Sequence, residues 1–408
     1  MKKALVLAGG LPQIELINKL KDRGYYTILI DFTLHPVAEC VADKFYREST
    51  LDLEMVSKIA QDEHVDMIIT CCTDQALNTV AHVAQELHLP CYITDEVGKA
   101  VTNKSYMKET FKEFDIPTAD FIITTTPECN HSLKYPVVVK PVDCNSSKGV
   151  SKVYDDKHEY EAIKTSIAFS RTHTAIVEEF VDGHEVSVDA FVCKGIAKVL
   201  CVSFSEKIAD KNSFVICRGM YPTLITENQY SKIETITQKI ADAFGLYNSP
   251  MLIQMLVNNE GIYVIEFSAR TGGCVKYKMI EYASGIDIIG STIDLFEGSI
   301  PQVNPIRSEH YVVDEFIYCT EGEFSHLEGV EVCKEQGWAK DVFLLKSSGT
   351  MMGSPQSSGD RIAAIVIIAD SMDDYIKKHN HIEKNIKVID SLGRDIMRHD
   401  LFVIGSQV

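Results

Sequence analysis

The stretch VVVKPVDCNSSKGV, residues 137–150, decides how the rest of the chain is interpreted. It places Lys140 at the end of an apolar run, with a loop of small and hydroxyl residues behind it. A phosphate-binding P-loop would need G-x-x-x-x-G-K-S/T between a strand and a helix, and neither GKS nor GKT occurs in the sequence. Pro141 instead ends the predicted strand, because proline cannot donate to a sheet ladder, and a turn follows.

Two interpretations of this loop fit its sequence. A lysine beside backbone N–H and hydroxyl donors can hold phosphate oxygens, and the loop can close over them. The donors would come from Ser146, Ser147 and Gly149. A solvated hairpin would have the same composition, so the loop alone leaves both interpretations open.

Composition excludes several classes of partner. The chain has 408 residues and a net charge of -18, which repels nucleic acid and anionic membrane surfaces but still permits a small anionic nucleotide. The sequence contains no apolar run near the roughly 20 residues that span a bilayer, and the apolar stretch after Met1 is too short for an export signal. Twelve scattered cysteines without a CxxC pair predict reduced thiols and a cytoplasmic protein.

The pattern along the chain predicts three regions, of α/β and α+β class. Residues 1–95 alternate short apolar runs with helical periods, which indicates a Rossmann-like parallel sheet with Asp52 and Asp74 at helix N-caps. Residues 96–300 begin with a helix and continue as closely spaced strands, with a smaller lid part at about 115–180. Residues 301–408 are predicted to form a separate α+β module.

The second informative stretch is AIVEEFVDGHEVSVDAF, residues 175–191. Acidic side chains lie on both sides of an apolar turn. The backbone groups of Phe180 and Val181 could bind the edge of a nucleotide base, with Glu178 beside the base and Glu185 bound to a ribose. A β-hairpin with an acidic solvent face has the same pattern. This stretch is therefore a candidate nucleotide-binding segment, and its sequence alone leaves both interpretations open.

The third stretch is LIQMLVNNEGIYVIEFSARTGG, residues 252–273, in which NNEG predicts a hairpin turn. Strand alternation puts Gln254 opposite Glu266, with Ser268 and Arg270 further along the same side. Carboxylate, amide and hydroxyl oxygens are hard ligands suited to Mg²⁺, and an arginine can clamp a carboxylate or a phosphoryl group. A structural Glu–Arg pair beside a glycine turn is the alternative.

In this order and at these separations, the three stretches resemble the ATP-grasp superfamily of carboxylate–amine ligases, over residues 1 to about 300. The resemblance implies an ATP-grasp fold with ATP and Mg²⁺ as cofactors, small-molecule carboxylate and amine substrates, and no nucleic-acid or membrane partner; it also permits a homodimer. The resemblance also implies a role for each site residue. Lys104 and Lys140 would bind the phosphates, Ser146, Ser147 and Gly149 would form the lid loop, Glu178, Phe180 and Val181 would surround adenine, and Glu185 would bind the ribose. Gln254, Glu266 and Ser268 would hold the metal, and Arg270 would bind the acyl phosphate.

Two positions depart from the family pattern, which usually has an acidic residue in place of Gln254 and an asparagine in place of Ser268. A neutral ligand lowers the negative charge that faces Mg²⁺. A nucleotide-binding protein without turnover would suit this substitution, and a bicarbonate-activating carboxylase would share the ATP site.

Other motifs support weaker hypotheses. Gly9 and Gly10 follow the first strand, but their spacing does not match the GxGxxG of a dinucleotide-dependent oxidoreductase. The letters HNH at residues 379–381 are interpreted as a coincidence, because no other metal ligands lie nearby in sequence. Arg218 and Tyr221 are further candidates for the substrate pocket.

Overall fold

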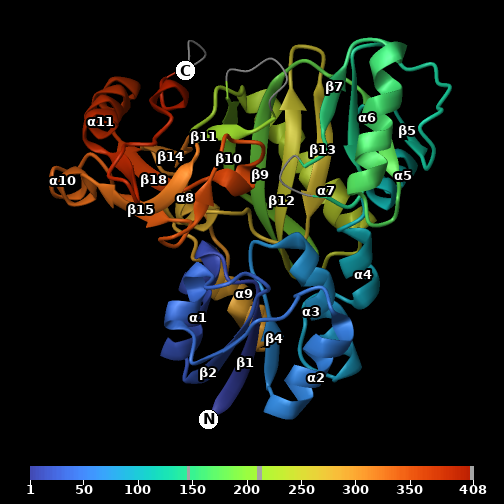
Figure 1. Cartoon of the computed structure of the whole chain (residues 1–408). Helices are drawn as coiled ribbons and strands as arrows, with labels where there is room; N and C mark the ends of the chain where they lie inside the picture. The colour runs from blue at the N-terminus through green and yellow to red at the C-terminus, as the bar shows by residue number, and fades with distance from the viewer. Residues whose placement is uncertain (145–147, 209–213, 405–408) are drawn as a thin grey trace.

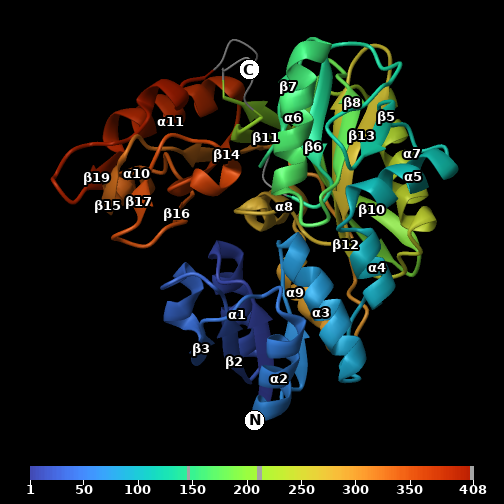
Figure 2. The same cartoon turned by 45° about the vertical axis from the view of Figure 1, so that its right-hand side comes forward.

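The computed structural model describes residues 1–144, 148–208 and 214–404. Figures 1 and 2 show the N-terminal domain below the two β-rich parts that form the rest of the molecule. Among the described residues, the strands form sheets with the orders β3-β2-β1-β4, β5-β8-β6-β7, β17-β15-β19 and β13-β12-β9-β10-β11-β14-β18-β16. No helix of the described part is long and apolar enough to cross a membrane.

The N-terminal sheet is parallel, as the alternating pattern predicted. Its core positions, such as Leu5, Ile28 and Ile68, are fully buried, because both faces of a doubly wound sheet are covered by helices. Its strands are β1 (Lys2–Leu7), β2 (Tyr25–Ile30), β3 (Lys44–Tyr46) and β4 (Met67–Ile69), and its helices are α1 (Leu11–Asp22), α2 (Leu53–Glu63) and α3 (Asp74–Glu86).

One of the two predicted helix caps is correct. The Asp52 carboxylate accepts a hydrogen bond from the backbone N–H of Met55 and caps α2. The prediction for Asp74 was wrong by one residue, because Thr73 is the N-cap and Asp74 is the first residue of α3. Its carboxylate extends to the central domain instead.

The helix predicted to begin at Asn103 is present as α5 (Lys104–Glu113), preceded by the short α4 (Asp95–Ala100). The Asn103 side chain caps it by accepting hydrogen bonds from the backbone N–H groups of the next turn. Met107 and Phe111 are buried on one face of the helix. The cap thereby fixes Lys104 at the first helical position, where the side chain enters the site described below.

A small antiparallel sheet, called the lid sheet here, carries Lys140 and Glu178. Its apolar face, which includes Val139 and Val177, packs on Ile163 of the covering helix. The sheet consists of β5 (Phe121–Thr124), β6 (Val137–Pro141), β7 (Ser151–Val153) and β8 (Ala175–Glu179), and the helix is α6 (Asp156–Phe169).

A large antiparallel sheet is the main structural element of the rest of the chain. Its first strands are β9 (His184–Cys193), β10 (Ile196–Lys207), β11 (Ile216–Tyr221), β12 (Ser249–Val257) and β13 (Ile262–Ser268). It continues through β14 (Tyr311–Ile317), β18 (Ala363–Ala369) and β16 (Asp341–Leu344). The helices α7 (Glu227–Ala243), α8 (Lys276–Ser284) and α9 (Ile288–Phe296) lie in the connections.

The large sheet is continuous across residue 300, because β11 pairs with β14. The C-terminal residues are therefore joined to the central ones through backbone hydrogen bonds, and the division of the chain at residues 95 and 300 stays a prediction. The remaining C-terminal elements are β15 (Gly322–Glu328), β17 (Met351–Met352), β19 (Lys387–Asp390), α10 (Val330–Glu335) and α11 (Met372–Asn385).

The predicted hairpin of β12 and β13 is confirmed, and its register places Gln254 directly opposite Glu266. Asn258 N–H donates to the carbonyl of Gly261 at 3.0 Å and closes the turn. Gly183, in the connection from the lid sheet to β9, lies so close to this hairpin that a Cβ would come within 2.9 Å of the Val257 carbonyl oxygen. This close approach places the chain that leaves the lid sheet beside the end of β12, where β9 begins to pair with it.

Candidate active site

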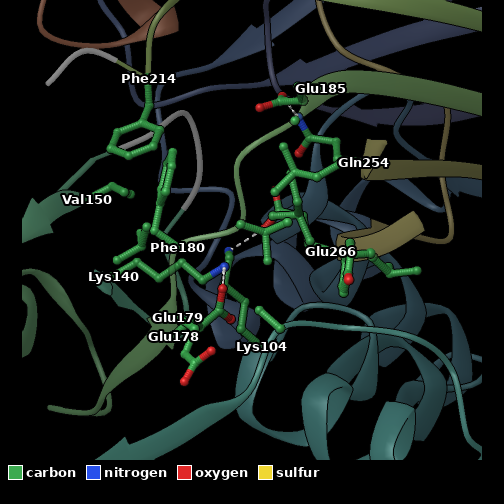
Figure 3. A pocket seen from close by; sticks show the side chains of 18 of the residues that line it. Lys104, Lys140, Val150, Glu178, Glu179, Phe180, Glu185, Phe214, Gln254 and Glu266 are labelled. Atoms are coloured by element: carbon green, nitrogen blue, oxygen red, sulfur yellow. Dashed lines mark hydrogen bonds and ion pairs between the residues drawn. The ribbon is translucent and has the colours of Figure 1, made fainter. Parts of the chain in front are cut away.

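A cleft lies between the lid sheet and strands β9 to β13 of the large sheet, and its space, the opening to solvent included, is about 1090 Å³. Figure 3 shows the lysines and carboxylates on its floor and the ring of Phe214 beside Phe180 on one wall. The predicted residues that line it are Lys104, Lys140, Glu178, Phe180, Val181, Glu185, Gln254 and Glu266. The structure thus brings together residues that are up to 162 positions apart (266 − 104).

The floor of the cleft holds two lysines on one carboxylate. Lys140 Nζ lies 2.9 Å from Glu178 Oε2, and Lys108 Nζ lies 3.0 Å from Glu178 Oε1. Burial would raise the pKa of Glu178, but the positive charges of Lys108 and Lys140 outweigh it and lower that pKa. The carboxylate of Glu178 therefore orients two ammonium groups toward the cleft.

Lys108 was missed by sequence reasoning, although it follows Lys104 by one helical turn on the same face of α5. It is 1% exposed, and it also contacts the Thr118 hydroxyl. Burial lowers the pKa of Lys108 to about 8, and the nearby charge of Lys140 adds to that effect while Glu178 opposes it.

A second lysine–carboxylate pair crosses from α5 to the large sheet. Lys104 Nζ lies 3.0 Å from Glu266 Oε2, and it donates to the carbonyl of Cys144 at 2.8 Å. Although burial alone would lower the pKa of Lys104, the charge and hydrogen bond of Glu266 raise it. Both predicted phosphate lysines thus pair with carboxylates.

A third group of polar contacts in the cleft surrounds Glu185. The Gln254 amide donates to Glu185 Oε1 at 3.1 Å, and Lys207 Nζ lies 2.7 Å from Glu185 Oε2. Because the amide nitrogen of Gln254 is directed to Glu185, its carbonyl oxygen is the atom left for another ligand. Lys207 was not predicted, since it lies in β10, which carried no recognisable motif.

The lid loop is described only in part. Ser146 and Ser147 lie outside the described residues. Gly149 is not among the residues that line the cleft, and it has a φ of 71°. A Cβ there would also come within 2.9 Å of the Pro141 ring, so this position requires glycine for its backbone.

A small cavity adjoins the cleft and contains the remaining predicted residues. Arg270 Nε donates to Asp74 Oδ1 at 2.7 Å, and Arg270 Nη2 contacts Asp74 Oδ2. The Ser268 hydroxyl also donates to Asp74. The cavity shares Lys104, Gln254 and Glu266 with the cleft, so the two spaces meet at these side chains.

The oxygen atoms in the small cavity are of the kinds that Mg²⁺ prefers as ligands. Glu266 supplies a carboxylate, Gln254 an amide oxygen and Ser268 a hydroxyl oxygen, and all three line the small cavity. Mg²⁺ is typically held by one or two carboxylates together with substrate phosphates. No group of three or more His, Cys, Asp or Glu side chains in the described ranges is arranged to hold a metal by itself.

The two further pocket candidates lie elsewhere. Arg218 is 2% exposed, and its guanidinium contacts the carboxylates of Glu206 and Glu315. The Tyr221 hydroxyl donates to the backbone carbonyl of Ser308. The interpretation of the HNH letters as a coincidence agrees with the buried His379, whose Nδ1 lies 2.8 Å from Glu315.

Asp189 on β9 and Asp314 on β14 are two buried carboxyl groups of the large sheet, each 1% exposed. Burial raises the pKa of Asp189 to about 6, since Lys276, the Gly272 backbone and Arg270 offset it only in part. Burial and the neighbouring charge of Asp189 raise the pKa of Asp314 to about 7, although Lys276 opposes the shift.

We expect Asp189→Asn to stabilise the fold at pH 8. A carboxyl with a raised pKa binds extra protons in the folded state between about pH 4 and pH 6, so folding stability falls as pH rises through that window. Removing the buried charge should gain about 2 to 3 kcal/mol at pH 8 and little at pH 4, measured by urea unfolding. The exposed Asp156→Asn is the control, and an equal gain at both pH values would contradict the assignment.

Comparisons with known proteins agree with this geometry. Residues 133–278 match the ATP-grasp domain family. The D-alanine–D-alanine ligase of Thermosipho africanus is 28% identical over 191 residues, which are 43% of this chain and 52% of that protein. The match spans about half of that ligase.

Two solved structures share the architecture over nearly the whole chain. The L-amino acid ligase from Bacillus licheniformis superposes with a TM-score of 0.80 at 19% identity and covers 96% of this chain and 99% of that one. The phosphoribosylglycinamide synthetase from Anaerococcus prevotii superposes with a TM-score of 0.75 at 22% identity, covering 96% and 100%. The predicted fold is confirmed: the chain has the ATP-grasp fold and carries an ATP-grasp domain over residues 133–278.

Proposed function

We propose that this protein is an ATP-dependent carboxylate–amine ligase, with small-molecule substrates and a cytoplasmic location in keeping with its twelve free thiols. The observation that carries the proposal is the pair of lysine–carboxylate contacts, Lys140–Glu178 and Lys104–Glu266, on the floor of a cleft between two antiparallel sheets. The ligases named above support it through the shared fold.

The nucleotide is proposed to lie along the cleft. Its base would lie against Phe180 and Val181, and its ribose would reach Glu185. The triphosphate would then meet Lys140 and Lys104, whose charges neutralise phosphate oxygens. A magnesium ion held by Glu266 with Gln254 and Ser268 would supply further neutralisation of the phosphate charge.

The reaction has two steps. A carboxylate oxygen of the first substrate attacks the γ-phosphorus, the bond from that phosphorus to the β,γ-bridging oxygen breaks, and ADP leaves. The amine nitrogen of the second substrate attacks the acyl carbon, the C–O bond to phosphate breaks, and the amine releases a proton. Lys140 and Lys104 stabilise charge in the first step, and Arg270 steadies the acyl phosphate between the two steps.

A screen for paired substrates tests this function. The protein is incubated with ATP, Mg²⁺, and amino acids and small carboxylates in pairs, and ADP and the coupled product are measured by chromatography and mass spectrometry. We expect ADP release that depends on both partners and yields one amide per ADP. Release that depends on bicarbonate would indicate a carboxylase, and nucleotide binding without release for any pair would contradict catalysis.

A further inference from the structure

An aspartate of the N-terminal domain reaches the predicted catalytic arginine. Asp74 and Arg270 are 196 positions apart, and Asp74 Oδ1 accepts from Arg270 Nε at 2.7 Å while Oδ2 contacts Nη2. The same carboxylate accepts the hydrogen bond of the Ser268 hydroxyl. One side chain thus holds two of the residues that the sequence assigned to the metal and the acyl phosphate.

The contacts leave a defined part of the guanidinium for a ligand. Arg270 uses one N–H of Nε and one of Nη2 on Asp74, and one of Nη1 on the carbonyl of Thr271 at 2.8 Å. A guanidinium has five N–H groups, so one N–H remains on each Nη atom. Either of them can donate to a phosphate or carboxylate oxygen.

The position of Asp74 is fixed by its own domain. The loop before α3 is tied down where the Gln13 amide donates to the Cys71 carbonyl at 2.7 Å and the Thr70 hydroxyl donates to the Leu7 carbonyl at 2.7 Å. The domain interface is held independently by Arg23, which contacts carboxylates at Asp294 and Glu297. Asp74 is therefore presented to Arg270 by a rigid support.

Burial strengthens the pairing. The side chains of Asp74 and Arg270 are 13% and 12% exposed, so water competes little for their hydrogen bonds. Burial would raise the pKa of Asp74, but the charge of Arg270 and its hydrogen bonds lower it. The Asp74 carboxylate presents both of its oxygens to one edge of the guanidinium.

We propose that Asp74 is a positioning residue, which fixes Arg270 with its two remaining N–H donors toward the transferring phosphoryl group and so makes the N-terminal domain part of the active site. The inference rests on the proposed function. Asp74 is not proposed to contact substrate, and its effect on the reaction passes through Arg270 and Ser268.

Asp74→Asn tests the role, because it keeps the size of the side chain and removes its charge. We expect kcat for ADP release to fall about 100-fold, while KM for ATP stays within about threefold, since the cleft lysines are untouched. Gln75→Ala is the matched control, as Gln75 lies in the same turn of α3 and contacts Asp143 and Arg171 instead. An unchanged kcat in Asp74→Asn, or an equal fall in the control, would overturn the role.

A second measurement does not depend on the substrates. Fluoroaluminate with MgADP mimics the transferring phosphoryl group, and we expect it to tighten MgADP binding by wild-type protein and by Gln75→Ala. In Asp74→Asn, the factor by which fluoroaluminate tightens MgADP binding should be at least about tenfold smaller than in the wild-type protein. The Kd of MgADP without fluoroaluminate should stay within about threefold of the wild-type value. Full tightening in the variant overturns the positioning role, whereas a wild-type protein that binds no MgADP overturns the proposed function itself.

Coupling to Arg270 is the third readout. In an Arg270→Lys background, Asp74→Asn should cost less than about threefold in kcat, because the two side chains act as a unit. If the fold-decrease in kcat of the double variant equals the product of the two single fold-decreases, Asp74 acts independently of Arg270 and the inference is refuted.

Discussion

Replacing Lys140 by methionine is expected to lower kcat for ADP release by about 100- to 1,000-fold, the usual cost of removing a group that stabilises transition-state charge. Lys140 is 5% exposed, and its ammonium group lies 2.9 Å from Glu178 on the floor of the cleft. Methionine keeps the apolar stem and removes the charge. The measurement is steady-state ADP release with the substrate pair found in the screen.

The control separates charge loss from misfolding. Lys164→Met removes a lysine from the exposed face of α6, where its ammonium group lies 3.5 Å from Glu161. We expect this variant to retain activity within about twofold, because exposed ion pairs contribute little. If Lys140→Met is folded by circular dichroism and keeps full kcat, the proposed role of Lys140 is wrong.

The largest effect on stability is expected from Arg218→Met. Glu315 is fully buried and accepts contacts from Arg218, Tyr375 and His379. Removing the arginine leaves a buried carboxylate without its main counter-charge, which typically costs about 3 to 5 kcal/mol. Urea unfolding at pH 7 measures this loss of stability. The control is the partly exposed Arg398→Met, which should cost under about 1 kcal/mol.

The same network predicts a dependence on acid. Burial would raise the pKa of Glu315, but the charges of Arg218 and His379 lower it to about 2, below the ordinary 4.5. The stabilisation from this carboxylate is therefore present above pH 4.5 and is lost as pH falls through about 2. The difference in free energy of unfolding between the wild-type protein and Arg218→Met should become smaller between pH 4.5 and pH 3. An equal difference at pH 7 and pH 3 would contradict this pairing.

Patterns within a few residues were predictable from the sequence. The alternation in residues 252–268 placed Gln254 opposite Glu266, because side chains in a hairpin repeat every second residue. The helix that begins near Asn103, with Met107 and Phe111 on one side, followed from helical periodicity, whereas the cap by Asn103 was seen only in the structure. The parallel N-terminal sheet followed from alternating strands and helices.

Contacts between distant segments were not predictable. Local signals indicated a cap at Asp74, whereas in the fold its carboxylate pairs with Arg270, 196 residues away. Glu178 was assigned to the base, but its carboxylate binds Lys108 and Lys140, because the packing of α5 against the lid sheet decides its partners. Such pairings depend on tertiary packing, which a single sequence does not encode in any short pattern.

The most direct test of the central claim is a crystal structure of the protein with MgADP. We expect the base beside Phe180 and Val181, the diphosphate within contact of Lys104 and Lys140, and the metal on Glu266. A nucleotide bound outside this cleft, for example at Gly9 and Gly10 of the N-terminal sheet, would contradict it.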